Sequence, residues 1–286
     1  MKIGFNESCD WFCKDHSVMR DLEYCEACGF DYIDLQVECL ERDLASGRCS
    51  LEEMGGWFRD HRLKPLSYSA LSQFNMKQTQ AGKNRVMAEL AEIIRRCEIL
   101  GCKMISVVPS VDLPVPAAVS EIRADAVAAL REMAELSTPH GIRLSLEFHG
   151  SPAMSVNQFS YAYDIVQQVD SPFVGVTLDQ YHFRAMSSQW EDLERADGGK
   201  IFIWHLTGME DMPCGAPYNT DEKRLWPGEP GDCLDHGRYA GILKKIGFAQ
   251  DVCTIKVLRP AYYELDQWEN VRKAAEVARA HAAKYW

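Results

Sequence analysis

The sequence predicts an α/β fold in which eight parallel strands close into a (β/α)8 barrel, a TIM barrel, as a single domain over residues 1–286. Short β-rich runs alternate with amphipathic helical stretches along the whole chain. The runs number eight, which is the strand count of this barrel. No G-x-G-x-x-G follows the first run, so a dinucleotide-binding sheet lacks its usual signature. An open, doubly wound parallel sheet is the alternative.

The predicted strands are runs of five to nine residues rich in β-branched and aromatic side chains. They cover residues 2–6, 30–36, 63–69, 102–110, 142–148, 173–179, 200–206 and 251–258. The last run, DVCTIKVL, places Lys256 among apolar neighbours. An ammonium group inside a buried strand requires a partner, so the sequence raises the question of what Lys256 faces.

The predicted helices have apolar residues three or four positions apart, which gives each helix one inward stripe. In residues 85–101 that stripe is Val86, Leu90, Ile93, Ile94 and Cys97. Glycine ends several of them, as Gly29 and Gly101 do. The helical stretches cover residues 18–30, 51–62, 85–101, 123–141, 157–170, 189–199, 237–248 and 268–286.

Composition excludes several classes of protein. With 31 basic and 42 acidic residues the formal charge is −11, which disfavours a nucleic-acid partner. No apolar run approaches the ~20 residues of a membrane span. The N-terminal stretch MKIGFNESCDWF has neither the basic start nor the apolar core of a signal peptide, so a cytoplasmic location is expected. The cysteines number eleven, and their odd count and apolar surroundings indicate buried reduced thiols.

Polar side chains gather at the carboxyl ends of the last four predicted strands: Glu147, Asp179, His205 and Lys256. Alternate residues of a strand share a face, so all four can point into the mouth of a barrel, where such enzymes place their chemistry. Carboxylates and an imidazole suit Mn²⁺, Mg²⁺, Co²⁺ or Zn²⁺. His182, three residues after Asp179, is a candidate contact for a substrate hydroxyl.

Each of these residues also has an ordinary structural explanation, since a single strand-end carboxylate is usually solvated and a single histidine is usually packed. Three polar residues at matching positions on consecutive strands favour a site. His149 fits a structural role as well as a functional one, and five other histidines receive no role: His16, His61, His140, His236 and His281. The proline- and glycine-rich stretch 207–234 is expected to be a binding loop or lid.

The chain resembles the xylose-isomerase-like barrels of the sugar isomerase and epimerase superfamily, and among them the inosose (2-keto-myo-inositol) isomerases of inositol catabolism. The likeness lies in the order and spacing of strings along nearly the whole chain. They are KIGFNE, CGFDYIDL, LKPLSYSALSQFN, LEFHGSPAMSVNQFSYAYDIV, LDQYHFRAM, KIFIWHL, RLWPGEPG and RPAYY.

The family holds a divalent cation with Glu, Asp, His and a second Glu at the ends of strands five to eight. The resemblance implies that Glu147, Asp179 and His205 are the first three ligands, and that His182 contacts the substrate. Arg224 and Trp226 match a loop that borders the active site and are expected to bind substrate. The fourth ligand falls on Lys256.

Replacing a carboxylate by an ammonium group changes the local charge by two units, so the metal site is expected to be weak or empty. Three outcomes stay open. Lys256 replaces the metal and acts on a carbonyl, a neutral Lys256 acts as a base beside a three-ligand metal, or the site is catalytically silent. Schiff-base chemistry is a fourth use. Weak or absent metal is ranked above bound metal.

The resemblance implies an isomerase or epimerase that acts on a cyclic keto-polyol or ketose by proton transfer through an enediol(ate), with Glu147, His182 and Lys256 as catalytic residues. One alternative is a lyase or dehydratase acting on an inosose-like or 3-keto-sugar substrate. Another is a silent polyol-binding barrel. The expected partner is a small polyol or keto-sugar, without nucleic acid or membrane, and a homo-oligomer is compatible with the sequence.

Overall fold

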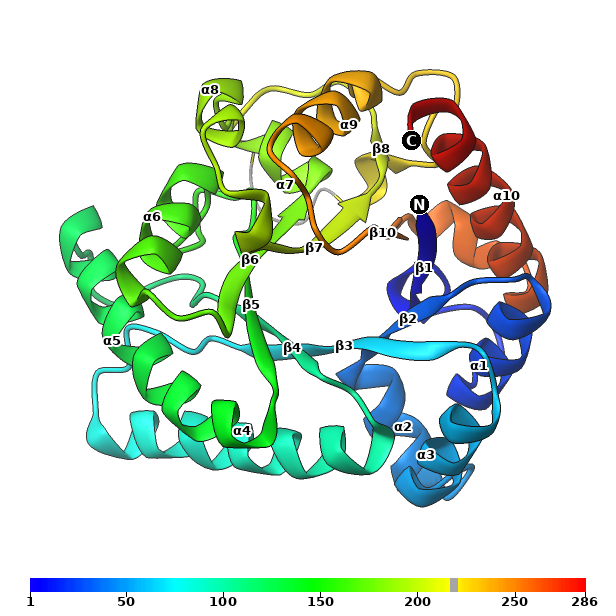
Figure 1. Ribbon diagram of the computed structural model, residues 1–286, viewed down its shortest axis with the longest axis horizontal. Helices are drawn as coiled ribbons and strands as arrows, with labels where there is room; N and C mark the ends of the chain where they lie inside the picture. The colour runs from blue at the N-terminus through cyan, green and yellow to red at the C-terminus, as the bar shows by residue number, and fades with distance from the viewer. Residues whose placement is uncertain (217–220) are drawn as a thin grey trace.

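Eight parallel strands form a closed barrel in the computed structural model, which describes residues 1–216 and 221–286. The predicted barrel is confirmed, and the open sheet is wrong, because β1 pairs with both β2 and β10. Figure 1 shows the ring of strands with helices around it. In ring order the strands are β1 (Lys2–Asn6), β10 (Val252–Ile255), β7 (Ile201–Leu206), β6 (Val174–Asp179), β5 (Arg143–Glu147), β4 (Met104–Val108), β3 (Lys64–Ser72) and β2 (Tyr32–Gln36).

The helices cover the outer face of the barrel (Figure 1), and each predicted helical stretch overlaps one of them, although α4 and α5 begin four or five residues earlier than predicted. They are α1 (Val18–Ala27), α2 (Val37–Ser46), α3 (Leu51–Asp60), α4 (Gln80–Leu100), α5 (Val119–Ser137), α6 (Phe159–Val169), α7 (Gln180–Ala185), α8 (Trp190–Glu194), α9 (His236–Lys245) and α10 (Gln267–Tyr285). Short 3-10 turns occur at η1 (Glu7–Cys9), η2 (Thr138–His140), η3 (Gly198–Lys200), η4 (Asp221–Lys223) and η5 (Pro260–Glu264). Helices α2 and α7 were not predicted.

Small and polar side chains fill part of the barrel interior below its mouth. The hydroxyls of Ser145 and Thr177, on neighbouring strands, lie 2.6 Å apart in a buried hydrogen bond. A Cβ on Gly4 would lie 2.7 Å from Thr254 Oγ1, so only glycine fits there. This layer supports the larger polar groups at the strand ends.

The connection after β7 carries a two-stranded hairpin, β8 (Gly208–Met209) with β9 (Arg224–Leu225). It belongs to the stretch expected to form a binding loop or lid, of which 217–220 lie outside the described residues. The hairpin matters for function because it brings Arg224 to the barrel, where its side chain is buried.

All eleven cysteines lie in the described residues and all are free, as expected. Eight of them are buried, but Cys28 is half-buried and Cys214 and Cys233 are exposed, so the expectation of buried thiols is wrong for these three. Among the described helices, none is both long and apolar enough to span a membrane.

Candidate functional site

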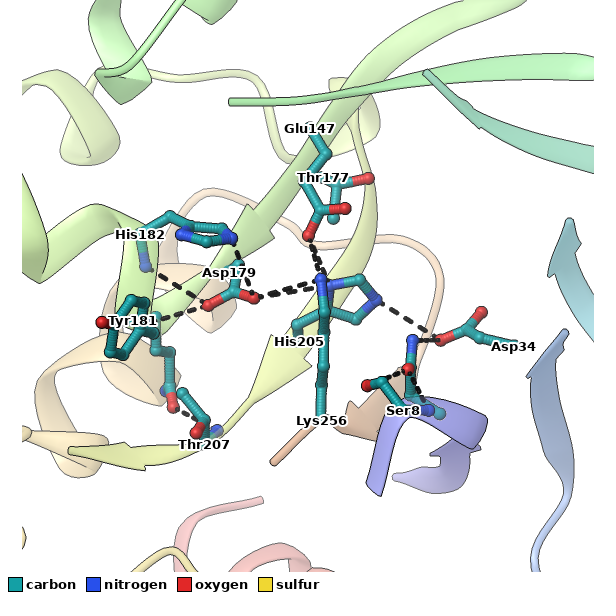
Figure 2. Close-up of polar contacts among 12 residues, drawn as sticks. Ser8, Asp34, Glu147, Thr177, Asp179, Tyr181, His182, His205, Thr207 and Lys256 are labelled. Carbon is teal, nitrogen blue, oxygen red and sulfur yellow. Dashed lines mark hydrogen bonds and ion pairs between the residues drawn. The ribbon is translucent and has the colours of Figure 1, made fainter. Parts of the chain in front are cut away.

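Four polar side chains meet at the carboxyl end of the barrel (Figure 2). Glu147, Asp179 and His205 are at or near the last residue of β5, β6 and β7, and Lys256 follows β10 directly. The register explains the convergence, because Asp179 pairs with His205, and His205 pairs with Thr254, two residues before Lys256. All four are buried, with exposed fractions between 0 and 7%.

The Lys256 ammonium lies between the two carboxylates. Its Nζ is 2.6 Å from Glu147 Oε1 and 3.5 Å from Asp179 Oδ2. Burial alone would lower the pKa of Lys256, but the two carboxylates outweigh burial and raise it. Burial would likewise raise the pKa of Glu147, but Lys256 and His205 hold it well below its usual value. Both groups are therefore charged, and the partner that the sequence required for Lys256 is Glu147.

Asp179 has a second cationic partner in Arg224. The guanidinium donates from Nη1 to Asp179 Oδ1 at 3.3 Å and from Nη2 to Oδ2 at 3.1 Å, and it stacks over the Tyr181 ring at 4.2 Å. Asp179 Oδ1 also accepts from the backbone N–H of Tyr181 at 2.8 Å and thereby caps α7. Despite burial, Arg224, His182 and Lys256 keep the pKa of Asp179 below its usual value.

His205 lies between carboxylates on two sides. Its Nδ1 is 3.0 Å from Glu147 Oε1, and its Nε2 is 3.3 Å from Asp34 Oδ2, on the far side of the barrel (Figure 2). Burial and Lys256 act to lower the pKa of His205, but Glu147 and Asp34 raise it above its ordinary value. His205 thus links Glu147 to Asp34.

The same side chains are candidate ligands for a divalent cation. Three ligand atoms, one each from Glu147, Asp179 and His205, lie within 4.8 Å of one another, so three donors converge. Lys256, however, puts a positive charge within 2.6 Å and 3.5 Å of two of those ligands. Lys256 and Arg224 already balance the two carboxylates. With Lys256 in this position, the set does not fit a divalent ion.

A cavity of about 240 Å³ opens beside this cluster. Its polar lining includes Gln36, Ser69, Glu147, His149, His182 and Lys256. Asp179 and His205 are not among the described residues that line it, so they act on a ligand through lining neighbours such as Glu147, Lys256 and Arg224. Such a lining of hydroxyl, amide and charged groups suits a ligand rich in hydroxyls.

His149 and His182 form a stacked pair in the wall of the cavity, with ring centroids 4.3 Å apart. Burial holds the pKa of His182 well below its ordinary value, so this imidazole is neutral and able both to donate and to accept a hydrogen bond. His149 Nε2 lies 3.8 Å from Glu147 Oε2. His149, which the sequence left between two roles, thus belongs to the cavity.

The two loop residues expected to bind substrate are placed differently. Arg224 lines the cavity. Trp226 is buried and stacks on Tyr262 with ring centroids 5.2 Å apart, and it is not among the described residues that line the cavity.

Sequence reasoning missed the contributions of the first strands, Gln36 from β2 and Ser69 from β3. The same inspection of strand ends in the first half of the chain would have found them. It also missed Asp34, whose carboxylate is beside His205.

Comparison with known proteins agrees with this architecture. Residues 22–281 match the model of the family described as "Xylose isomerase-like TIM barrel". Inosose isomerase of Bacillus velezensis is 37% identical over 287 residues, covering 100% of this chain and 99% of that protein. Inosose isomerase of Bacillus subtilis is 36% identical over 298 residues with the same coverage.

Among solved structures, that of IOLI protein with a binding zinc atom superposes with a TM-score of 0.93 at 36% identity, covering 100% of this chain and 99% of that one. D-psicose 3-epimerase from Clostridium cellulolyticum H10 superposes with a TM-score of 0.76 at 16% identity, covering 99% of each chain, and shares the fold. The chain belongs to the xylose isomerase-like TIM barrel family and, by homology along its whole length, is an isomerase.

Proposed function

We propose that the protein isomerises a cyclic keto-polyol of the keto-inositol type, moving the carbonyl between adjacent ring carbons. Full-length relatives named inosose isomerases and a cavity lined by polyol-binding groups support this substrate class. The observation that carries the mechanism is the Lys256–Glu147 pair in the cavity wall, 2.6 Å from Nζ to Oε1.

The reaction needs one base and one acid. The base removes the proton from the hydroxyl-bearing carbon beside the carbonyl, and the carbonyl oxygen gains a proton as the C=C bond of an enediol forms. A proton then returns to the former carbonyl carbon, while the neighbouring hydroxyl loses its proton and becomes the new carbonyl. Substrate and product are isomers, so no oxidant or reductant is consumed.

Glu147 is assigned as the base, because it lines the cavity beside Lys256 and is charged, whereas Glu38, another carboxylate of the lining, is exposed. Lys256 donates a hydrogen bond to the substrate carbonyl and stabilises the oxyanion that develops there. Neutral His182 exchanges protons with the ring hydroxyls. Arg224 fixes Asp179, and Asp179 with Glu147 fixes Lys256. Trp226 stacks on Tyr262 away from the lining, so no substrate contact is assigned to it.

In this proposal no resident divalent ion lies among Glu147, Asp179 and His205, since the ammonium of Lys256 takes the electrostatic part that a metal has in the family. The charges support it, because Lys256 and Arg224 face Glu147 and Asp179 one for one.

Incubation with a keto-inositol in D2O tests the function. The expected result is a mixture of positional isomers carrying solvent deuterium on the carbon that receives the proton. Glu147→Gln is expected to lose roughly 10²–10⁴-fold in rate, the usual contribution of a general base. The control is Glu89→Gln, the same exchange at an exposed site on α4, with unchanged rate. Equal loss in both variants would contradict the assignment.

A lyase is the second candidate, and Lys256 favours it because an ammonium in the cavity can protonate a departing hydroxyl. It begins with the same removal of a proton and ends with loss of water, so mass analysis of the product separates the two. Ligand-induced thermal stabilisation without deuterium exchange would instead identify a silent polyol-binding barrel.

A further inference from the structure

A second cluster of acidic and imidazole side chains lies on the loop that follows β1. It consists of Asp10, His16 and Asp21, with Glu7 beside them, and all four are buried, with exposed fractions of 0 to 3%. Asp10 ends the 3-10 turn η1, and Asp21 lies in the first turn of α1. The cluster therefore joins the loop after β1 to the helix that follows it.

The donor atoms of this cluster converge on one point. His16 Nε2 is 2.8 Å from Asp21 Oδ2 and 3.5 Å from Asp10 Oδ1. One ligand atom from each of Asp10, His16 and Asp21 lie within 4.8 Å of one another. Two carboxylates and an imidazole around one point are the ligand types of Zn²⁺ and Mn²⁺ sites.

The second observation is a set of buried carboxylate oxygens that are poorly satisfied. Among the described residues, Asp10 Oδ2 and Glu7 Oε1 have no hydrogen-bond partner, and Asp10 Oδ1 has only the long contact with His16 Nε2 at 3.5 Å, although both side chains are fully buried. By contrast, Glu7 Oε2 accepts from the Gln36 backbone N–H at 2.6 Å, and Asp21 Oδ1 accepts from Gln267 Nε2 at 2.5 Å. An unpartnered buried carboxylate is costly, because it has lost its water and gained nothing in exchange.

The positive charge near these carboxylates is small. Arg42 contacts the cluster through Nη2, 2.5 Å from His16 Nδ1, and its side chain is 39% exposed. In the described part of the chain, His16 is the one imidazole in direct contact with Asp10 and Asp21, and it faces three buried carboxyl groups in all, those of Glu7, Asp10 and Asp21.

We propose that Asp10, His16 and Asp21 form a binding site for one divalent transition-metal ion of the Zn²⁺ or Mn²⁺ class, with Glu7 as a further oxygen ligand. The ion binds His16 through Nε2, so the ring proton moves to Nδ1. Arg42 then turns from Nδ1 toward Asp43, whose Oδ1 lies 3.9 Å from Arg42 Nε.

This site is separate from the barrel mouth. None of Glu7, Asp10, His16 and Asp21 is among the described residues that line the cavity. Two neighbours in the sequence, Ser8 and Trp11, do line it. A bound ion would therefore fix one wall of the substrate cavity without touching the substrate.

The test is calorimetric titration of chelator-treated full-length protein with ZnCl2 or MnCl2, together with thermal unfolding. Asp10→Asn removes the charge at nearly constant shape. Asp15→Asn makes the same exchange on the same loop at an exposed residue and is the matched control. Glu147→Gln removes a donor from the barrel mouth instead. The wild type, Asp15→Asn and Glu147→Gln are expected to bind one ion per chain at the loop, and Asp10→Asn to lose at least 100-fold in affinity.

Stability gives an independent readout that does not depend on activity. The metal is expected to raise the unfolding temperature of the wild type and of Asp15→Asn but not that of Asp10→Asn. In chelator, Asp10→Asn is expected to be as stable as the wild type or more so, which also shows that it folds. Zinc absorption spectra are expected to show nitrogen and oxygen ligands without sulfur, although Cys9 and Cys13 are near.

Any of three results would overturn the proposal. The wild type binds no metal, Asp10→Asn binds it as tightly as the wild type does, or Glu147→Gln loses the tight site while Asp10→Asn keeps it. The proposal would also be overturned if Asp10→Asn unfolded at a higher temperature than the wild type both with and without metal. The carboxyl groups of the wild type would then share a proton and not a metal ion.

Discussion

Lys256→Glu offers the sharpest test of the barrel mouth, because it restores the ligand that the family keeps at this position. In the wild type, Lys256 Nζ lies 2.6 Å from Glu147 Oε1 and 3.5 Å from Asp179 Oδ2. A divalent ion held by these carboxylates and His205 would lie close to the ammonium. At a separation of about 5 Å and an effective dielectric constant near 20, the repulsion is roughly 7 kcal/mol.

A carboxylate at residue 256 reverses the sign of that interaction. If only about 4 kcal/mol of the change survives solvent screening and side-chain movement, the dissociation constant for Zn²⁺ or Mn²⁺ falls about 1000-fold. Arg224 stays on Asp179 in both forms, so it affects both equally.

The assay is calorimetric titration of metal into chelator-treated protein, made in the Asp10→Asn background so that the loop site does not contribute. Lys256→Gln, which removes the charge without adding a ligand, separates repulsion from ligation. Lys223→Glu repeats the charge change at a partly exposed lysine paired with Glu210. Equal affinity at the barrel mouth in the wild type and Lys256→Glu would refute the electrostatic argument.

Two further predictions concern the scaffold. In Gly150→Ala the new Cβ would lie 2.7 Å from His182 O and 2.8 Å from Ala185 Cβ, so α7 must shift. The variant is expected to lose about 1–3 kcal/mol of unfolding free energy and to lose isomerase activity. The control is Gly241→Ala, in open space on α9, whose unfolding free energy should rise by up to about 1 kcal/mol. Burial lowers the pKa of His281 to about 3, while the unfolded value is about 6.5, so the folded state binds fewer protons and stability falls as pH drops below about 6.5. His281→Phe should remove this slope and, between pH 7 and pH 5, lose about 2 kcal/mol less than the wild type in urea unfolding; identical slopes would contradict the burial argument.

The fold was predictable because each strand and helix carries its own periodicity. The two helices that were missed show where that signal fails. Helix α2 follows β2 with no intervening residue, so no turn signal marks the change from strand to helix. Helix α7 has six residues, too few for a helical stripe, and its cap is Asp179, which had been considered only as a metal ligand.

The convergence of Glu147, Asp179, His205 and Lys256 follows from strand order, because parallel strands end at the same rim. The partners of these residues do not follow from it. Arg224 reaches Asp179 from a hairpin 45 positions along the chain, and no local pattern encodes that distance.

The Asp10–His16–Asp21 cluster was missed for a related reason. The three residues are spread over an irregular loop and the start of a helix, where neither a period of two nor a period of 3.6 brings side chains together. His16 could not be distinguished by sequence from an exposed loop histidine, although it is 3% exposed.

The two clusters have opposite charge balances, so removal of metal by a chelator should affect stability and activity differently. At the barrel mouth, Lys256 and Arg224 match Glu147 and Asp179, so a divalent ion there would add uncompensated charge. On the loop after β1, three buried carboxylates face His16 and the half-exposed Arg42, so an ion there would supply what is lacking. A chelator should therefore lower the unfolding temperature while leaving isomerisation intact well below that temperature. Loss of activity at full thermal stability would place the ion at the mouth, and the ammonium of Lys256 would then not be the group that stabilises the oxyanion.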